Sequence, residues 1–379
     1  MSLHRIYFAP GMFGFGRIGA YDYFAHVERE IVAKVRARGH DAHTYVVDVL
    51  PTASIRKRAA TFAELVARTC DDDRERGPIH LVGHSTGGLD ARLVASPSAV
   101  LPIAPGSLDW LPRLASVTTV NTPHYGTPLA SFFATLAGQR LLYTMSALTI
   151  AALTVGAPPM AAASALVVAI GGADRALGLE LRALDRATDA ILRVLDDAPR
   201  KEIRNFLDAI RKDQGSVVQL TPEAMDLFQA GIENRAGVRY QSTVSMAPPP
   251  SAMRYVRSLS SAWSAASATL FAAIWRITAR VDERYPCAAK LDAAAQAAFT
   301  RGFGQLPDLR ASDGVVPVHS QVWGDVVWAG YADHLDVLGH FKDDGSGTEH
   351  RDWLASGAEF TRAKFDQMTD AIVAGMFST

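Results

Sequence analysis

The sequence is poor in cysteine and carries almost no net charge. Its 379 residues include only Cys70 and Cys287, which allow one disulfide at most and exclude both a disulfide-rich scaffold and a four-cysteine zinc site.

Lys and Arg number 38 against 39 Asp and Glu, so no charge excess steers the chain toward nucleic acid or an anionic membrane. With 49% apolar and 20% charged residues, the composition is that of a globular protein and excludes a wholly disordered chain. Near neutrality also favours a neutral small molecule over a polyanion as ligand.

The N-terminus lacks the pattern of an export signal. Such a signal needs a basic start, an apolar run and a small-residue cleavage site, whereas here the strand-like residues Ile6–Phe8 follow almost at once. The sequence therefore predicts a cytoplasmic protein, or a secreted one if it is a processed form.

One stretch, Leu141–Ala173, contains no charged residue at all. A membrane-spanning helix needs about 20 apolar residues, but Pro158 and Pro159 interrupt this stretch after Ala157. The sequence thus predicts no transmembrane span. Two interpretations remain: a helical hairpin buried in a core, or a lid whose apolar inner face lines an acyl-chain pocket and contacts a lipid surface when open.

The rest of the chain alternates between strand and helix patterns, which predicts a mostly parallel sheet covered by helices on both faces. The strand candidates are Ile6–Phe8, Ala42–Asp48, Ile79–Val82, Ala115–Asn121, Val238–Val244 and Val326–Ala329. The helix candidates that cover them are Tyr23–Arg38, Thr52–Thr69, Gly88–Ala95 and Phe360–Phe377.

Two helical segments interrupt this alternation. Residues 131–235 are nearly all helical in pattern and contain the uncharged stretch, and residues 250–301 follow three consecutive prolines that end any regular element. We interpret residues 1–379 as a single α/β domain, with 131–235 as a helical lid or cap insertion and 250–301 as a second, mostly helical insertion.

A candidate nucleophile lies directly after the apolar strand Ile79–Val82. The residues Gly83-His84-Ser85-Thr86-Gly87 match G-x-S-x-G, in which glycines let the backbone pass close to a serine on a strained strand-to-helix turn. A helical pattern follows, so the context fits this turn. The alternative is a glycine-rich turn with an inert serine.

A serine nucleophile needs a base and an acid that orients the base, and on this kind of sheet they follow the serine as acid, then histidine. The histidines that follow Ser85 are His124, His319, His334, His340 and His350. We favour His334, which comes just after the strand Val326–Ala329. Asp313, in an Asp-Gly turn 21 residues earlier, is the preferred acid over its rivals Asp333 and Asp336.

The oxyanion hole needs two backbone N–H groups aimed at the developing charge. Thr86, directly after the nucleophile, and Met12, in the glycine-rich loop after the first strand, are the candidates. The candidate pocket residues are Phe13, His84, His124 and Tyr125, of which His124 either shapes the pocket floor or makes structural hydrogen bonds. The uncharged stretch begins soon after the loop Asn121–Thr127, and this position favours its interpretation as a lid.

Taken in order, these motifs resemble those of the α/β-hydrolase superfamily and, more narrowly, of the bacterial lipases of Pseudomonas and Burkholderia. They are Pro10–Phe15 in the oxyanion loop, Gly83–Gly88 at the nucleophile, Asn121–Thr127 before the lid, Leu220–Ala224 and Phe228–Ala230 after it, Asp313–Pro317 at the acid turn and His334–Asp336 in the histidine loop. The resemblance spans nearly the whole chain and implies an α/β-hydrolase fold with a lid.

The sequence also departs from that family. Pro10 stands where the family's oxyanion loop has a histidine, and the two cysteines do not occupy the positions of the family's disulfide, so their pairing stays open. The resemblance implies a structural calcium ion held in part by Asp336. The glutamine expected four residues further on is His340, and because calcium disfavours imidazole this departure argues against calcium.

These observations predict a serine carboxylester hydrolase, most simply a lipase that acts on a small-molecule or lipid ester and requires no cofactor. Ser85 attacks the ester, His334 moves the proton and Asp313 orients the imidazole. An acyltransferase, thioesterase or polyester depolymerase with the same triad is the alternative, and a non-catalytic binding module is the third possibility.

Overall fold

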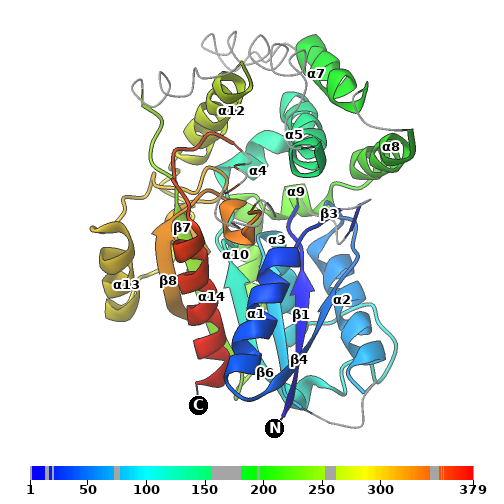
Figure 1. Ribbon diagram of the computed structural model, residues 1–379, viewed down its shortest axis with the longest axis vertical. Helices are drawn as coiled ribbons and strands as arrows, with labels where there is room; N and C mark the ends of the chain where they lie inside the picture. The colour runs from blue at the N-terminus through cyan, green and yellow to red at the C-terminus, as the bar shows by residue number, and fades with distance from the viewer. Residues whose placement is uncertain are drawn as a thin grey trace.

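A six-stranded parallel sheet forms the centre of the computed structural model, which describes residues 2–12, 17–18, 21–71, 77–155, 181–193, 197–251, 262–341, 350, 352 and 354–378. The strands lie in the order β4-β1-β5-β6-β7-β8 (Figure 1). They are β1 Leu3–Ala9, β4 Asp41–Val46, β5 Ile79–His84, β6 Leu114–Val120, β7 Arg239–Met246 and β8 Asp325–Tyr331. Each sequence-predicted strand is therefore present, within a few residues of its expected bounds. A small hairpin, β2 Arg17–Ile18 and β3 Tyr21–Asp22, lies outside this sheet.

Helices cover both faces of the sheet, as the sequence predicts. Successive residues of β1 point to opposite faces: Ile6 and Phe8 belong to the core cluster under α1 (Ala25–Ala37) and α14 (Arg362–Phe377), whereas Tyr7 and Ala9 belong to the cluster under α2 (Ile55–Thr69) and α3 (Thr86–Ala95). β1 is buried on both sides, which explains why its second half, Ile6–Ala9, is apolar or aromatic throughout. This arrangement confirms the predicted α/β-hydrolase fold class.

A layer of helices lies at the carboxyl ends of the strands (Figure 1). The helices of this layer are α4 Pro128–Phe133, α5 Leu136–Val155, α7 Leu181–Arg193, α8 Asp197–Lys212, α9 Gly215–Gln219, α10 Pro222–Gly231 and α12 Ala262–Thr278. A further helix, α13 Ala293–Phe303, packs beside β8. The described parts of 131–235 and 250–301 are thus mostly helical, apart from the irregular residues 232–235 and 279–292. Residues 156–180, which include the paired prolines, lie outside the described residues.

The uncharged stretch begins in α5, and its residues 141–148 are packed against protein. Leu142 and Leu148 of α5 are fully buried in one cluster with Leu184 and Ile191 of α7. Within the described residues, no helix has the length and apolar character that crossing a membrane requires. Both cysteines are buried and free, so the open question of their pairing is answered: they form no disulfide.

A chain of buried histidines lies at the amino ends of the central strands. The Nδ1 of His4 and the Nε2 of His80 are 2.9 Å apart, and the Nδ1 of His80 is 2.8 Å from the Oγ of Ser116. Burial, reinforced by the neighbouring His4, lowers the pKa of His80 to about 3. Burial, reinforced by His40, lowers the pKa of His4 to about 4. The folded protein therefore holds these imidazoles neutral.

We predict that this chain makes the protein sensitive to acid. The unfolded chain takes up a proton on His80 as the pH falls below about 6.5, and the folded chain does not, so the free energy of unfolding is highest above that pH and decreases below it by up to about 1.4 kcal/mol per pH unit. Replacing His80→Gln should reduce this slope between pH 6.5 and 4.5 in urea unfolding curves. A slope identical in the variant and the original chain would contradict the prediction.

Candidate active site

Ser85 occupies a strained turn between β5 and α3. Its backbone has φ 55° and ψ −126°, a conformation that residues other than glycine rarely adopt. Its N–H donates to the carbonyl of Val120 on the neighbouring strand β6, at 2.8 Å. The turn places Thr86 as the first residue of α3, where backbone N–H groups have no partner within the helix. The sequence motif thus has the strand–turn–helix context that its interpretation requires.

The glycines on either side of Ser85 are required because backbone passes directly against them. A Cβ on Gly83 would lie 2.2 Å from the carbonyl carbon and oxygen of Gly87, and a Cβ on Gly87 would lie 2.0 Å from the carbonyl oxygen of Ala9. Gly11, in the loop after β1, is equally close, because its Cβ would lie 2.7 Å from the Cβ of Ser85. This close packing holds the serine turn and the loop after β1 together.

Three side chains from separate loops form one hydrogen-bonded chain at this turn. The Nε2 of His334 lies 3.0 Å from the Oγ of Ser85, and its Nδ1 lies 2.7 Å from the Oδ2 of Asp313. All three are buried. The structure thus brings together the three residues that the sequence analysis selected, in an arrangement that lets the imidazole accept the serine proton while the carboxylate fixes its tautomer. Their catalytic role stays a prediction.

The Asp313 turn explains why this aspartate, and not a rival, contacts the imidazole. Its Oδ1 accepts hydrogen bonds from the N–H groups of Val315 and Val316, at 2.9 and 2.7 Å, which leaves Oδ2 directed at His334. Asp333 and Asp336 instead bond each other's backbone: Asp333 Oδ1 accepts from the Asp336 N–H and Asp336 Oδ2 accepts from the Asp333 N–H.

A buried ion pair anchors the loop that carries the oxyanion candidate Met12. Arg58, on α2, donates three hydrogen bonds from Nε and Nη2 to the carboxylate of Asp90 on α3, and a further one from Nη2 to the carbonyl of Pro10, at 2.5 Å. Both charged side chains are almost fully buried. Because a buried charge is stable only when it is paired and hydrogen-bonded, this pair fixes the position of the loop relative to α3. No local sequence pattern indicates this pair, because Arg58 and Asp90 meet only through the tertiary fold.

His84 also holds loops in place, and its expected place in the pocket stays a prediction. Its ring is fully buried. Its Nδ1 lies 2.7 Å from the hydroxyl of Tyr23, and its Nε2 lies 2.9 Å from the backbone carbonyl of His334. Burial, with the neighbouring His334, holds the pKa of His84 well below its usual range. The neutral ring therefore accepts from Tyr23 and donates to the histidine loop. Like Arg58 and Asp90, Tyr23 was not identified from the sequence.

His124 likewise makes structural contacts. It is fully buried, with Nδ1 2.9 Å from Arg92 and Nε2 3.1 Å from the hydroxyl of Thr119. Burial and the adjacent Arg92 hold the pKa of His124 well below its usual range. Both ring nitrogens of His124 are thus bonded inside the protein, which agrees with the structural alternative, and its place in the pocket stays a prediction.

Two pocket candidates remain, Tyr125 and Phe13. The backbone N–H of Tyr125 donates to the Oγ of Ser320 at 3.0 Å, and its side chain is partly buried. Phe13 lies outside the described residues.

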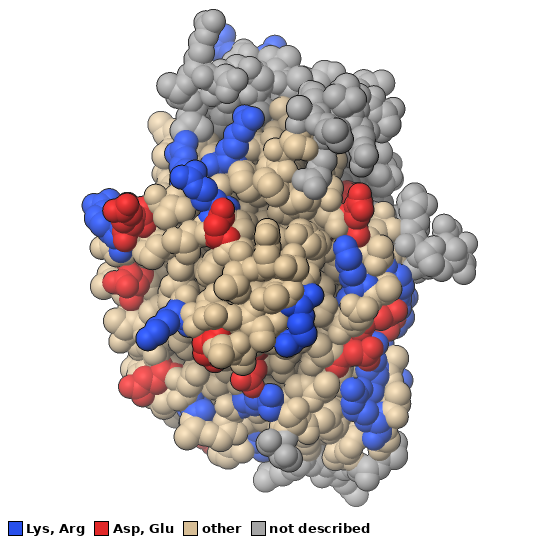
Figure 2. Space-filling model, turned by 90° about the vertical axis from the view of Figure 1, so that its left-hand side faces the viewer, with Lys and Arg blue, Asp and Glu red and all other residues tan. Residues whose placement is uncertain are grey.

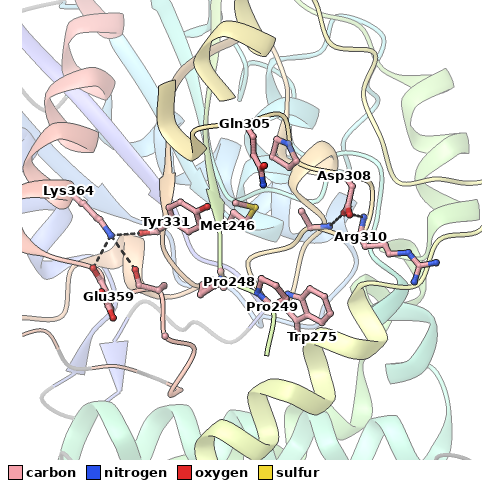
Figure 3. Close-up of a pocket in the computed structure, with 15 residues that line it drawn as sticks. Met246, Pro248, Pro249, Trp275, Gln305, Asp308, Arg310, Tyr331, Glu359 and Lys364 are labelled. Atoms are coloured by element: carbon pink, nitrogen blue, oxygen red, sulfur yellow. Dashed lines mark hydrogen bonds between the residues drawn. The ribbon is translucent and has the colours of Figure 1, made fainter. Parts of the chain in front are cut away.

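A separate cavity of about 590 Å³ lies at the ends of β7 and β8 (Figure 3). Met246, Trp275 and Tyr331 contribute apolar walls, and the ammonium group of Lys364 donates to backbone carbonyls at its edge. Its volume suits a small ligand. None of its lining residues belongs to the Ser85–His334–Asp313 chain, so its size does not make it the active site.

The donor set near Asp336 does not fit the calcium ion that the sequence resemblance implies. Among the described residues, the candidate ligand atoms come from Asp336, His350 and Asp352, and they all lie within 4.8 Å of one another. Calcium binds six to eight oxygen atoms, whereas this set offers two carboxylates and one imidazole. His340, at the position expected for glutamine, is not a member of this cluster.

The surface around the β8 side of the molecule mixes both signs of charge. Figure 2 shows Lys and Arg side chains interspersed with Asp and Glu on this face, without a field of one sign. This view agrees with the balanced composition of 38 basic and 39 acidic residues.

Comparison with known proteins gives only distant structural likenesses. No family model and no curated protein matches the sequence. Among solved structures, EstA from Clostridium botulinum has a TM-score of 0.49 at 18% identity, covering 96% of this chain and 87% of EstA. The lipase of Staphylococcus hyicus has a TM-score of 0.48 at 15% identity, covering 97% and 94%. The mature lipase BlEst2 of Bacillus licheniformis has a TM-score of 0.43 at 14% identity, covering 88% and 85%. The function of this chain must therefore be argued from its own site.

We predict that Gly83→Ala destabilises the protein by about 3 kcal/mol or more, because the new Cβ meets backbone that no side-chain rotation can move aside. Gly231→Ala is the matched control: it ends α10, has nothing within 4 Å of its Cβ position, and should be neutral or stabilising by about 0.5–1 kcal/mol. Chemical denaturation of both variants checks the difference. Equal stability of the two would contradict the close packing at Ser85.

Proposed function

We propose that this protein is a serine carboxylester hydrolase that works through an acyl-enzyme on Ser85. The observation that carries the proposal is the hydrogen-bonded chain from Ser85 through His334 to Asp313, with distances of 3.0 and 2.7 Å. The chain starts at a serine whose strained backbone presents it between a strand and a helix N-terminus. A structural serine needs neither the strain nor the buried partners.

The reaction follows from this arrangement. His334 Nε2 removes the hydroxyl proton as Ser85 Oγ attacks the ester carbonyl carbon, and the imidazolium is stabilised by Asp313. The backbone N–H groups of Thr86 and Met12 donate to the oxyanion. The imidazolium then protonates the departing alcohol, which leaves the acyl group on Ser85. Water, deprotonated by His334, releases the acid and restores the enzyme. These steps use only groups of the chain itself, so the proposed reaction requires no cofactor.

The apolar helices near the site favour an ester with a sizeable apolar acyl chain. The helical layer at the carboxyl ends of the strands includes α4 and α5, whose side chains Phe132, Phe133 and Leu141 belong to the same apolar cluster as Met12 of the oxyanion loop. We propose that this layer acts as a lid, that its apolar inner side binds the acyl chain, and that its opening gives transient contact with a lipid surface.

We predict that Ser85→Ala abolishes covalent labelling by a fluorophosphonate probe, because the acylated oxygen is removed. Ester hydrolysis should disappear with it. Ser107→Ala, which changes a serine remote from His334, is the matched control and should label like the original chain. Asp313→Asn should reduce kcat by about 10³–10⁴-fold through the wrong imidazole tautomer while leaving the fold intact. Labelling that persists in Ser85→Ala would remove Ser85 as the nucleophile.

We also predict that hydrolysis of p-nitrophenyl esters becomes more efficient from acetate toward longer acyl chains, with a further gain when a detergent or lipid interface is present. Steady-state kcat/KM across acetate, butyrate, octanoate and palmitate measures this preference. Adding an alcohol and quantifying the transferred ester separates hydrolysis from acyl transfer. A strict preference for acetate with no interfacial gain would leave an esterase and remove the lid from the proposal.

A further inference from the structure

A cluster of polar side chains beside the histidine loop has no role in the proposed reaction. Asp336 lies two residues after His334, and His350 and Asp352 approach it from a later part of the chain. The Nδ1 of His350 is 3.7 Å from Asp336 Oδ1 and 2.8 Å from Asp352 Oδ1. One imidazole nitrogen therefore faces two carboxylates.

Within the described part of the chain, three buried atoms in and beside this cluster are left without hydrogen-bond partners. They are Oδ1 of Asp336, Nε2 of His350 and Oδ2 of the neighbouring Asp333. The side chain of Asp336 is only 2% exposed and that of His350 only 6%. A buried carboxylate oxygen without a donor costs free energy. A cation between these side chains would bind Asp336 Oδ1 and offset the negative charges of Asp336 and Asp352.

From these contacts we infer that Asp336, His350 and Asp352 bind a divalent transition metal ion of the zinc type, and not calcium. The imidazole of His350 favours zinc over calcium, because nitrogen is a preferred ligand of zinc and a poor one of calcium. Tetrahedral zinc with ligands at about 2.0–2.2 Å places those ligands about 3.3 Å from one another. The Asp336–His350 separation of 3.7 Å is near this value, and the His350–Asp352 pair needs only to open from 2.8 Å.

The fourth position and the entry path are set by Asp352. Its side chain is 63% exposed, in contrast to those of Asp336 and His350. A water molecule completes the tetrahedron from the solvent side, as zinc allows. The ion thereby links the segment that carries His350 and Asp352 to the loop that carries His334.

Zinc binding to the chelator-treated full-length chain tests this inference. We expect calorimetric titration with Zn²⁺ to show a site that Ca²⁺ and Mg²⁺ do not fill, and Zn²⁺ to raise the unfolding temperature more than either. Asp352→Asn should weaken zinc binding about tenfold or more, and its exposed position leaves folding unaffected. Asp370→Asn removes an aspartate of similar exposure, 58%, on α14 and should bind zinc like the original chain.

A second variant tests the choice of metal. His350→Asp replaces the nitrogen ligand by a third carboxylate, so zinc affinity should fall and Ca²⁺ should now raise the unfolding temperature. All of these readouts are independent of ester hydrolysis. Calcium stabilising the original chain as much as zinc does would overturn the inference, and so would Asp352→Asn binding zinc with unchanged affinity.

Discussion

The backbone conformation of Ser85 is the constraint on which the site depends. A residue at φ 55° and ψ −126° is strained by about 1–3 kcal/mol and keeps that conformation only where its surroundings leave no alternative. Gly83 and Gly87 supply those surroundings, since each lies against backbone at a distance that excludes any side chain. The same turn presents the serine hydroxyl to His334 and begins α3 at Thr86. One strained residue thus positions both the proposed nucleophile and a proposed oxyanion donor.

Two separate sets of buried contacts hold the loops around this turn. Arg58 joins the carbonyl of Pro10 to Asp90 on α3, so the loop that carries Met12 cannot move independently of the helix that follows Ser85. Tyr23 and His84 join the region after β1 to the carbonyl of His334. Buried polar groups are costly when they are left unpaired. Each set therefore favours the arrangement in which all of its members are bonded, and that arrangement is the one in which Ser85 and His334 meet.

The sequence was sufficient for those parts of the structure that local patterns determine. Apolar runs between turn residues located all six strands of the sheet. Ser85 and His334 were selected because each closely follows one of these strands, and Asp313 because its Asp-Gly turn lies between them in the chain. Contacts between distant residues were not accessible in the same way. Nothing near Arg58 in the sequence indicates that it reaches Pro10, and His84 and His124 were assigned to the pocket because they adjoin its motifs. Their burial and bonding partners arise from packing between elements far apart in the chain.

Several of these long-range contacts meet at the histidine loop, which carries His334. His334 uses its two ring nitrogens for Asp313 and Ser85, its backbone N–H for the carbonyl of Asp313 and its own carbonyl for His84. Asp333 and Asp336 then close the loop with reciprocal hydrogen bonds. A displacement of Asp336 is therefore transmitted over two residues to an imidazole that must stay 3.0 Å from Ser85. Because a shift of about 1 Å in a catalytic group can cost about 100-fold in rate, whatever fixes Asp336 also sets the geometry at the serine. This connection gives the polar cluster at Asp336 a reason to be rigid, although it lies outside the reacting groups.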